Sequence, residues 1–122
     1  MTTLVPPATF INILVSVQPK ADKPGHYEVS TEPPTVQVLN EDTVINYQIV
    51  DTDGYPIVFT GMTVHPKDNN QFSKETISID GKLMAFIDAN TEKMTLSIKL
   101  HFQDKDGIKF SHDPQIQNEP EG

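Results

Sequence analysis

The hydrophobic positions of this 122-residue chain recur with a period of two residues, the spacing of a β-strand rather than of a helix. The clearest run is MTLSIKLHFQ at 94–103, in which apolar side chains alternate with polar ones. Such alternation predicts a strand with one face in a core and the other in water. Similar runs predict further strands at 9–17, 26–30, 35–39, 43–50, 57–65, 76–79, 83–87 and 108–111.

Turn signals separate these runs. Asp-Gly pairs lie at 53–54, 80–81 and 106–107, and Pro-Pro lies at 33–34. Glycine accepts positive φ and proline cannot donate to a central ladder, so both favour turns over strands. We therefore predict an all-β fold, an immunoglobulin-like antiparallel β-sandwich of about seven to nine strands, with a closed barrel as the alternative.

Side-chain parity predicts the register of the hairpin in TISIDGKLMAF, residues 76–86. A two-residue turn at 80–81 places Ile77 opposite Met84 and keeps Ile79 on the same face as both. Pattern and turn chemistry then agree, so we expect Ile79 to face the core.

The hairpin in LHFQDKDGIKF, residues 100–110, requires a different loop. A two-residue turn would expose the apolar side chains that follow it. A three-residue loop at 105–107, with Gly107 at positive φ, instead pairs Phe102 with Phe110 on the core face. We predict this second register.

Length and composition indicate one domain. A chain of this size buries enough surface for a core without disulfides, and it has no cysteine for a disulfide, a thiolate metal site or a cysteine nucleophile. We expect residues 1–122 to form a single β-sandwich domain, with 1–8 an N-terminal tail and 112–122 a C-terminal arm.

The first apolar run lacks a preceding Lys or Arg, and no window approaches the ~18 apolar residues of a membrane span. We therefore expect a bacterial, cytoplasmic protein without a membrane partner.

The formal net charge is −8, and all nine cationic residues are lysines. Nucleic-acid binding depends on a basic field and on bidentate guanidinium groups, so an acidic chain without arginine disfavours it. We expect no nucleic-acid partner, and a surface of this kind mainly keeps a protein soluble.

Two Asp-x-Asp-Gly fragments, at 51–54 and 104–107, have the first residues of a calcium loop. A complete loop needs a bidentate Glu at about its twelfth position, where this chain has Met62 and Gln115. We predict hairpin turns whose aspartates bond their own backbone.

The four histidines lack the spacing of a metal site or of a hydrolase motif. Parity places His101 on the wet face of its strand, and places His112 opposite Leu100, on the other face or at its edge. There is no GxSxG motif to position a nucleophile. We therefore expect no enzyme activity, no metal and no cofactor.

The C-terminal sequence SHDPQIQNEPEG raises the question of a functional site. Asp113-Pro114 should end a strand, since proline has no N–H to donate. Glu119-Pro120 is a second acidic residue–proline pair, and Ile116 is the apolar residue between the two pairs. Composition alone favours a tail that blocks edge pairing through proline and charge.

The same segment resembles a known family. HDPQIQNEP, with its Asp-Pro and Glu-Pro pairs, resembles the signature of the DP-EP family of small uncharacterised bacterial proteins. DKDGIKFS at 104–111 and INILVSV at 11–17 also resemble the PixA/AidA-like inclusion-body proteins. The resemblance implies a cytoplasmic β-sandwich of unassigned function, in a group prone to form inclusions, and it supplies no catalytic residues. Members of the related group often have an aromatic residue where this chain has His112.

We therefore predict a non-enzymatic, self-associating or binding protein of the inclusion-body type, most simply a homodimer. The arm should be ordered to about Pro120, with 121–122 frayed, and should cover a sheet edge and help form the subunit contact. The alternative is a small-ligand or metal-binding domain that uses His112, Asp113 and Glu119, with Asp104 or Asp106 nearby. The candidate binding residues are His112, Asp113, Pro114, Ile116, Glu119 and Pro120.

Overall fold

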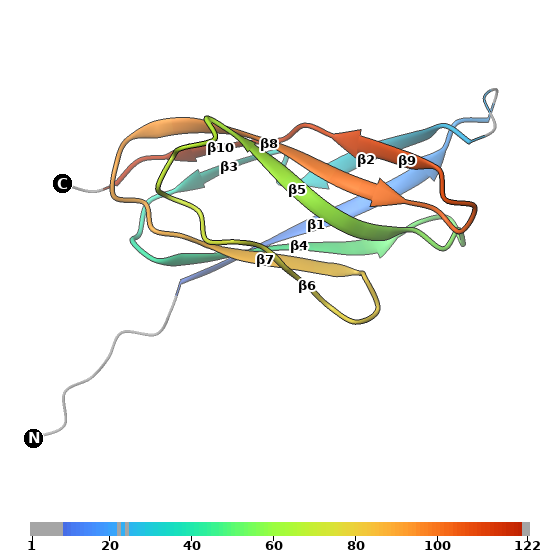
Figure 1. The fold of residues 1–122 in the computed structure, drawn as a ribbon, viewed down its shortest axis with the longest axis horizontal. Coiled ribbons are helices and arrows are strands. Elements are labelled where there is room, and N and C mark those ends of the chain that lie inside the picture. Colours follow the sequence, from blue (N-terminus) through green and yellow to red (C-terminus); the bar gives the residue numbers. More distant parts are fainter. Residues whose placement is uncertain (1–8, 22, 24, 121–122) are drawn as a thin grey trace, which may run out of the picture.

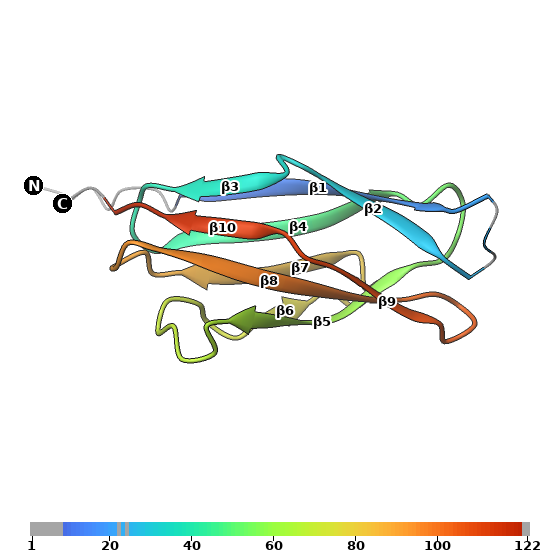
Figure 2. The same cartoon turned by 90° about the horizontal axis from the view of Figure 1, so that it is seen from above.

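The computed structural model describes residues 9–21, 23 and 25–120, which form two β-sheets packed face to face (Figure 1). Sheet A has the strand order β2-β1-β4-β7-β6, with bounds β1 (Phe10–Pro19), β2 (Tyr27–Glu32), β4 (Thr43–Asp51), β6 (Thr76–Ile77) and β7 (Leu83–Asp88). Sheet B has the order β3-β10-β8-β5, and β9 also pairs with β8; the bounds are β3 (Thr35–Val38), β5 (Val58–His65), β8 (Met94–Gln103), β9 (Lys109–His112) and β10 (Gln115–Asn118). The strands run along the long axis of the molecule (Figure 2).

The prediction of an all-β sandwich is confirmed. The described residues form ten strands rather than seven to nine. The expectation of purely antiparallel sheets is wrong, because each sheet contains one parallel pair, β1 with β4 and β3 with β10. The strand beyond the expected number is β10, whose four residues lie between two prolines and are too few to show an alternating pattern. Among the described residues, no helix has the length and apolar character that crossing a membrane requires.

The core lies between the sheets and consists of the inward positions of both. The alternation in 94–103 is confirmed, because Leu96, Ile98, Leu100 and Phe102 are buried and the residues between them are not. The other buried hydrophobic residues are Ile13, Val15, Val17, Val36, Val38, Ile45, Tyr47, Ile49, Ile57, Phe59, Met84, Phe86 and Ile116.

The predicted register of the β8–β9 hairpin is confirmed. Phe102 pairs with Phe110, and Gly107 has a φ of 79°. The backbone N–H of Asp104 donates to the carbonyl of Ile108 at 3.0 Å, which closes the three-residue loop. The ring of Phe110 then stacks on Phe102 with centroids 5.1 Å apart, so the hairpin contributes to the core.

The β6–β7 hairpin keeps the predicted pairing of Ile77 with Met84, but the expectation for Ile79 is wrong. The side chain of Ile79 is fully exposed. The carbonyl of Ser78 accepts from the N–H of Gly81 at 2.9 Å, which makes a turn with Ile79 at one of its corners. A turn corner points a side chain into solvent, whatever its parity along the strand.

A buried polar network joins three segments at one end of the sandwich. Asn118 of β10 donates from Nδ2 to Asp88 Oδ1 at 2.9 Å and to Gln71 Oε1 at 3.3 Å. Asp88 Oδ1 also accepts from the backbone N–H of Asn90 at 3.0 Å, and Gln71 Oε1 accepts from that of Thr91 at 2.8 Å. The network therefore fastens β10 to the β5–β6 and β7–β8 connections.

Three oxygen atoms of this network lack a donor within the described part of the chain: Asp88 Oδ2, Asn90 Oδ1 and Asn118 Oδ1. All three side chains are buried. A buried acceptor without a donor costs about 1–3 kcal/mol. Burial also raises the pKa of Asp88, against the opposing effect of the hydrogen bonds from Asn118 and Asn90. The site therefore disfavours the ionised carboxylate, because it offers too few donors to replace water.

Gly107→Ala should lower the free energy of unfolding by about 1 kcal/mol, because an L side chain is disfavoured at this positive φ even though the added Cβ would meet nothing within 4 Å. Gly81→Ala should cost more, since its φ is 73° and its Cβ would lie 2.6 Å from the Cβ of Val58. Chemical denaturation of both variants measures the difference. Equal losses would show that the contact with Val58 relaxes freely.

Asp88→Asn should raise the free energy of unfolding at neutral pH by about 1 kcal/mol. The uncharged amide group replaces Asp88 Oδ2, which is a buried acceptor that receives no hydrogen bond. The gain should shrink in acid. The folded-state pKa of Asp88 is raised, so the carboxyl group stabilises the fold fully below its unfolded-state pKa and loses that contribution as pH rises through the folded-state value. Urea unfolding at acidic and neutral pH tests this, and a variant less stable than wild type at neutral pH would contradict it.

Candidate functional site

The Asp-Pro pair of the predicted site lies inside one continuous partner of β8. His112 of β9 pairs with Leu100, and Gln115 of β10 pairs with Ser97. Both partners advance by three residues between these pairs, so the register is the same on either side of Asp113-Pro114. The carbonyl of Pro114 still accepts from the N–H of Ile98 at 2.9 Å. Asp113-Pro114 therefore interrupts the strand without shifting it.

β10 is an internal strand of sheet B, with β3 hydrogen-bonded to one edge and β8 to the other. Its alternating side chains place Ile116 in the core, fully buried, and Gln115 in solvent. The segment therefore covers the edge of β8 as an internal strand of sheet B, and β10 keeps no free edge for a strand of another subunit. The structure describes the segment as far as Pro120, and the expected fraying of 121–122 lies outside the described residues.

His112, Asp113 and Pro114 line a shallow hollow of about 390 Å³ with residues of β2, β3 and their connection. His112 is half-buried, and burial lowers the pKa of its imidazole while the neighbouring Asp113 partly opposes this. As predicted, His112 lies opposite Leu100 and away from His101. The hollow therefore offers a neutral imidazole and one exposed carboxylate.

Glu119 and Pro120 lie at the other end of β10. Glu119 Oε2 accepts from Gln37 Nε2 at 2.5 Å, and the backbone N–H of Glu119 donates to the carbonyl of Val38 at 2.9 Å. Six residues of extended chain separate Asp113 from Glu119, a distance of about 20 Å. The Asp-Pro and Glu-Pro pairs therefore do not meet in one site, and each fixes one end of β10.

The Asp-x-Asp-Gly fragments form turns, as predicted. Asp104 Oδ1 accepts from the backbone N–H groups of Asp106 and Ile108, both at 2.9 Å, and Asp51 Oδ1 accepts from that of Asp53 at 3.0 Å. Asp104 is at the far end of the β8–β9 hairpin from His112, so these groups do not converge. Within residues 9–21, 23 and 25–120, no three His, Asp or Glu side chains gather in a way that could hold a metal ion.

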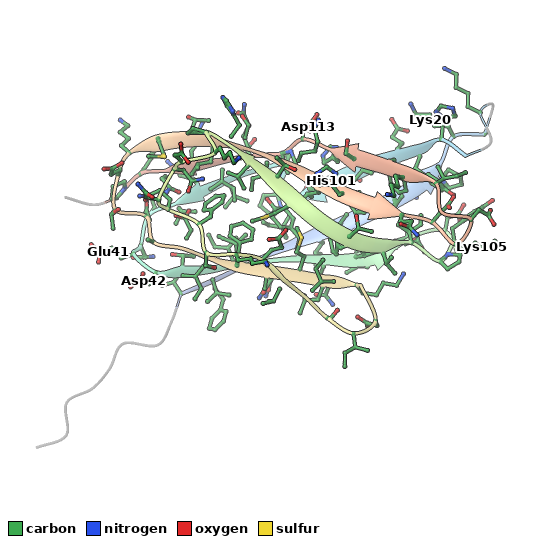
Figure 3. All side chains as sticks on the ribbon, viewed as in Figure 1. Lys20, Glu41, Asp42, His101, Lys105 and Asp113 are labelled. Carbon is green, nitrogen blue, oxygen red and sulfur yellow. The ribbon has the colours of Figure 1, made fainter. Side chains whose placement is uncertain are left out.

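The β1–β2, β4–β5 and β8–β9 connections meet at one end of the sandwich (Figure 1). A pocket of about 330 Å³ opens between them. We call it the end pocket. Its lining is mostly apolar and aromatic, and the charged residues Lys20 and Lys105 belong to the same end of the molecule (Figure 3). The lining residues are Pro19, Lys20, Ala21, Gly25, Tyr27, Tyr55, Pro56, Asp104, Lys105, Asp106 and Ile108.

The end pocket contains the clearest polar contact of the candidate sites. The hydroxyl of Tyr27 donates to Asp104 Oδ2 at 2.7 Å. This hydrogen bond raises the pKa of Tyr27 to about 12, with smaller contributions from burial and from the charge of Asp104. The same bond lowers the pKa of Asp104, so the carboxylate stays ionised and the phenol stays protonated.

Sequence reasoning found Asp104 and Asp106 but missed the two tyrosines. Tyr27 and Tyr55 line the pocket with ring centroids 6.2 Å apart and planes at 76°. Tyr27 also stacks on Phe110 at 4.5 Å. No motif marks this arrangement, because β2, the β4–β5 connection and the β8–β9 hairpin are distant in sequence and meet only in the fold.

A second polar contact lies on the outer face of sheet B. Thr63 Oγ1 and His101 Nε2 are 2.8 Å apart, and both line an open hollow that also includes Asp113 (Figure 3). No hydrogen bond joins His101 to Asp113 in the described structure. The imidazole therefore lacks the third group that would orient it as a general base.

Over its three central strands, the outer face of sheet A carries one charged side chain, that of Asp51, which ends β4 and pairs with the outward Ser16. We call the other outward positions of β1, β4 and β7 the uncharged face. Phe10, Val44 and Ile87 lie side by side across these strands, and Leu14, Gln48 and Leu83 form a parallel row. The full set is Phe10, Asn12, Leu14, Ser16, Gln18, Val44, Asn46, Gln48, Val50, Leu83, Ala85 and Ile87.

Comparison with known proteins gives one family match. The model of the DP-EP family matches residues 9–120, which is nearly the whole chain and includes both strands that flank Asp113-Pro114. No curated protein matches the chain. The C-terminal resemblance is thus extended to every strand of the sandwich, and the chain belongs to the DP-EP family.

Proposed function

We propose that this protein is a non-enzymatic, self-associating cytoplasmic protein of the inclusion-body type, whose copies pair as homodimers through the uncharged face. The observation that carries the proposal is the composition of that face. Its twelve positions carry no charge, and one exposed carboxylate, that of Asp51, borders them at the end of β4, in a chain in which 21% of residues are charged. Depletion of charged residues is the compositional mark of an interface core.

Large side chains on the uncharged face are exposed to solvent. Phe10 is 60% exposed, Val50 50%, Ile87 46% and Leu14 44%. The neutral pair Asn12 and Asn46 lies between two of their rows, so large apolar and uncharged polar side chains share one face, a composition that marks an interaction site. Burying these side chains against a partner recovers the hydrophobic stabilisation that the isolated chain forgoes.

The size of sheet A fits a pair of copies. Its longest strand has ten residues, about 33 Å, and its five strands span about 24 Å. The other four strands are shorter, and the 33 residues of the sheet cover about 500 Å², or about 1,000 Å² for two partners, which is the size of a small, weak interface. A second copy presents an identical flat sheet of this size, as face-to-face β-sheet packing requires.

Charge at the margins of sheet A also favours a second copy. Glu28 and Glu32 point outward on β2 at one edge, and Lys74 lies beside β6 at the other. A two-fold axis parallel to the strands places the β2 edge of one copy over the β6 edge of its partner. Opposite charges then meet at the rim, while the uncharged centres meet without bringing like charges together in a chain of net charge −8.

The site geometry supports a role without catalysis. Thr63 and His101 form the one hydroxyl–imidazole pair described, and that pair lies exposed without an orienting carboxylate bonded to the imidazole. The ionised Asp104 is fully engaged by Tyr27 and by backbone N–H groups, so it is not free to act as a base.

Leu14→Lys should shift the protein from dimer to monomer, because it places one ammonium group per copy in the centre of the uncharged face. Each buried, unpaired charge costs several kcal/mol, more than enough to abolish a micromolar association. Sedimentation velocity over a range of protein concentrations measures the change.

Thr95→Lys is the matched control. Thr95 is an exposed, outward position of β8, so this variant adds the same charge to the opposite face and should remain a dimer. A wild-type protein that sediments as a monomer at every concentration up to its solubility limit would refute self-association. A dimer that survives Leu14→Lys but dissociates in Thr95→Lys would place the contact on sheet B instead.

A further inference from the structure

We propose that the end pocket binds an organic cation, a small molecule or side chain that carries an ammonium group, preferably a methylated one. The end pocket lies at the tip of the sandwich and shares no residue with the uncharged face. The proposal is therefore independent of self-association.

The walls of the pocket suit a cation with an apolar surface. Tyr27 and Tyr55 form an aromatic corner, with planes at 76° and centroids 6.2 Å apart. Tyr55 is 44% exposed and Ile108 39%, so both have apolar surface left to cover. A cation within about 6 Å of an aromatic centroid is attracted by the negative ring face, and its methyl groups pack on apolar neighbours.

The polar end of the pocket carries a negative charge that forms no ion pair within the described residues, although the charge of Lys105 contributes to the lowered pKa of Asp104. Asp104 is 6% exposed, and its hydrogen-bond partners are the phenol of Tyr27 and two backbone N–H groups, all of them neutral. These donors hold the carboxylate ionised without cancelling its field. A phenol that donates to a carboxylate also gains electron density, which makes the Tyr27 ring more attractive to a cation.

The lysines of the pocket do not reverse this preference. Lys20 and Lys105 are both exposed, where water and salt screen their charges, whereas Asp104 is almost fully buried. An anion in the pocket would stand next to Asp104 and beside the two tyrosine rings. The sign of the buried charge therefore selects a cationic ligand.

The size of the pocket limits the ligand to one small group. About 330 Å³ is at the lower end of small-molecule sites, enough for a single amine headgroup. Gly25 helps to keep this space, because a Cβ there would approach Ile108 Cδ1 to 3.0 Å.

Choline and its neutral isostere, in which carbon replaces the quaternary nitrogen, test the proposal on the wild-type chain. The protein has no tryptophan and three tyrosines, two of which line the pocket, so tyrosine fluorescence reports on this site. Backbone amide shifts of Asp106 and Ile108 in NMR titrations locate the binding. Choline should bind saturably, and the isostere, which has the same shape without the charge, should bind at least about tenfold more weakly.

Two variants assign the effect to named groups. Asp104→Asn should weaken choline binding by about tenfold, since the amide oxygen still accepts the turn hydrogen bonds but the charge is gone. Asp51→Asn is the matched control, because Asp51 closes the same kind of turn outside the pocket and its loss should leave binding unchanged. Tyr55→Leu, which keeps an apolar side chain without a π face, should weaken binding about threefold to tenfold.

Three results would overturn the inference. Absence of saturable choline binding would remove the cation site, and equal affinity for choline and its isostere would show an apolar pocket only. A stronger response to a methyl glycoside or to acetate than to choline would show a sugar or an anion site instead. Sources of the cation are separated by comparing choline with a trimethyllysine peptide, and preference for either one supports the shared chemistry.

Discussion

The structure depends on the unbroken pairing of residues 109–118 with β8. One register runs from Phe110 opposite Phe102 to Asn118 opposite Met94, through the proline that interrupts the hydrogen-bonding. At one end this pairing closes the β8–β9 hairpin and brings Asp104 to Tyr27; in the middle it buries Ile116; at the other end it brings Asn118 to Asp88. A slip of one residue would turn all of these side chains to the wrong face. Asp113-Pro114 and Glu119-Pro120 therefore stand at the two ends of β10, where the pairing with β3 begins and ends.

The two ends of the sandwich treat a buried carboxylate in opposite ways. Asp104 receives three hydrogen bonds and stays ionised, whereas Asp88 retains one oxygen without a donor and has a raised pKa. The difference follows from the backbone. A tight turn directs the N–H groups of Asp106 and Ile108 at Asp104, in addition to the phenol of Tyr27. Asp88, the last residue of β7, receives one backbone N–H and one side-chain N–H, both on the same oxygen. The ionised carboxylate is therefore stabilised at Asp104, beside the end pocket. It is disfavoured at Asp88, at the end of the sandwich where Asn118 holds β10.

Sequence reasoning succeeded where a pattern extends over several residues. The alternation in 94–103 and the parity across 105–107 predicted β8 and the register of Phe110, because periodicity repeats the same information many times. It failed where the fold depends on a single position or on a very short segment, because no pattern can repeat there. Ile79 has the parity of a core residue but occupies a turn corner, and β10 has too few residues between its prolines for any period to appear. The end pocket could not be predicted from the sequence, because Tyr27, Tyr55 and Asp104 lie far apart along the chain and become neighbours only when the fold brings three connections together.

The charge distribution explains how a strongly acidic chain can still carry surfaces for contact. The inward face of each sheet must be apolar to form the core, but the outward face is free to be charged, and sheet B uses that freedom with Lys99 and Asp113. The three central strands of sheet A use it only at Asp51, the last residue of β4, and their other outward positions are uncharged. Folding alone does not require this restriction, because outward side chains do not enter the core. The proposed contact with a second copy is a constraint that excludes charge in this way.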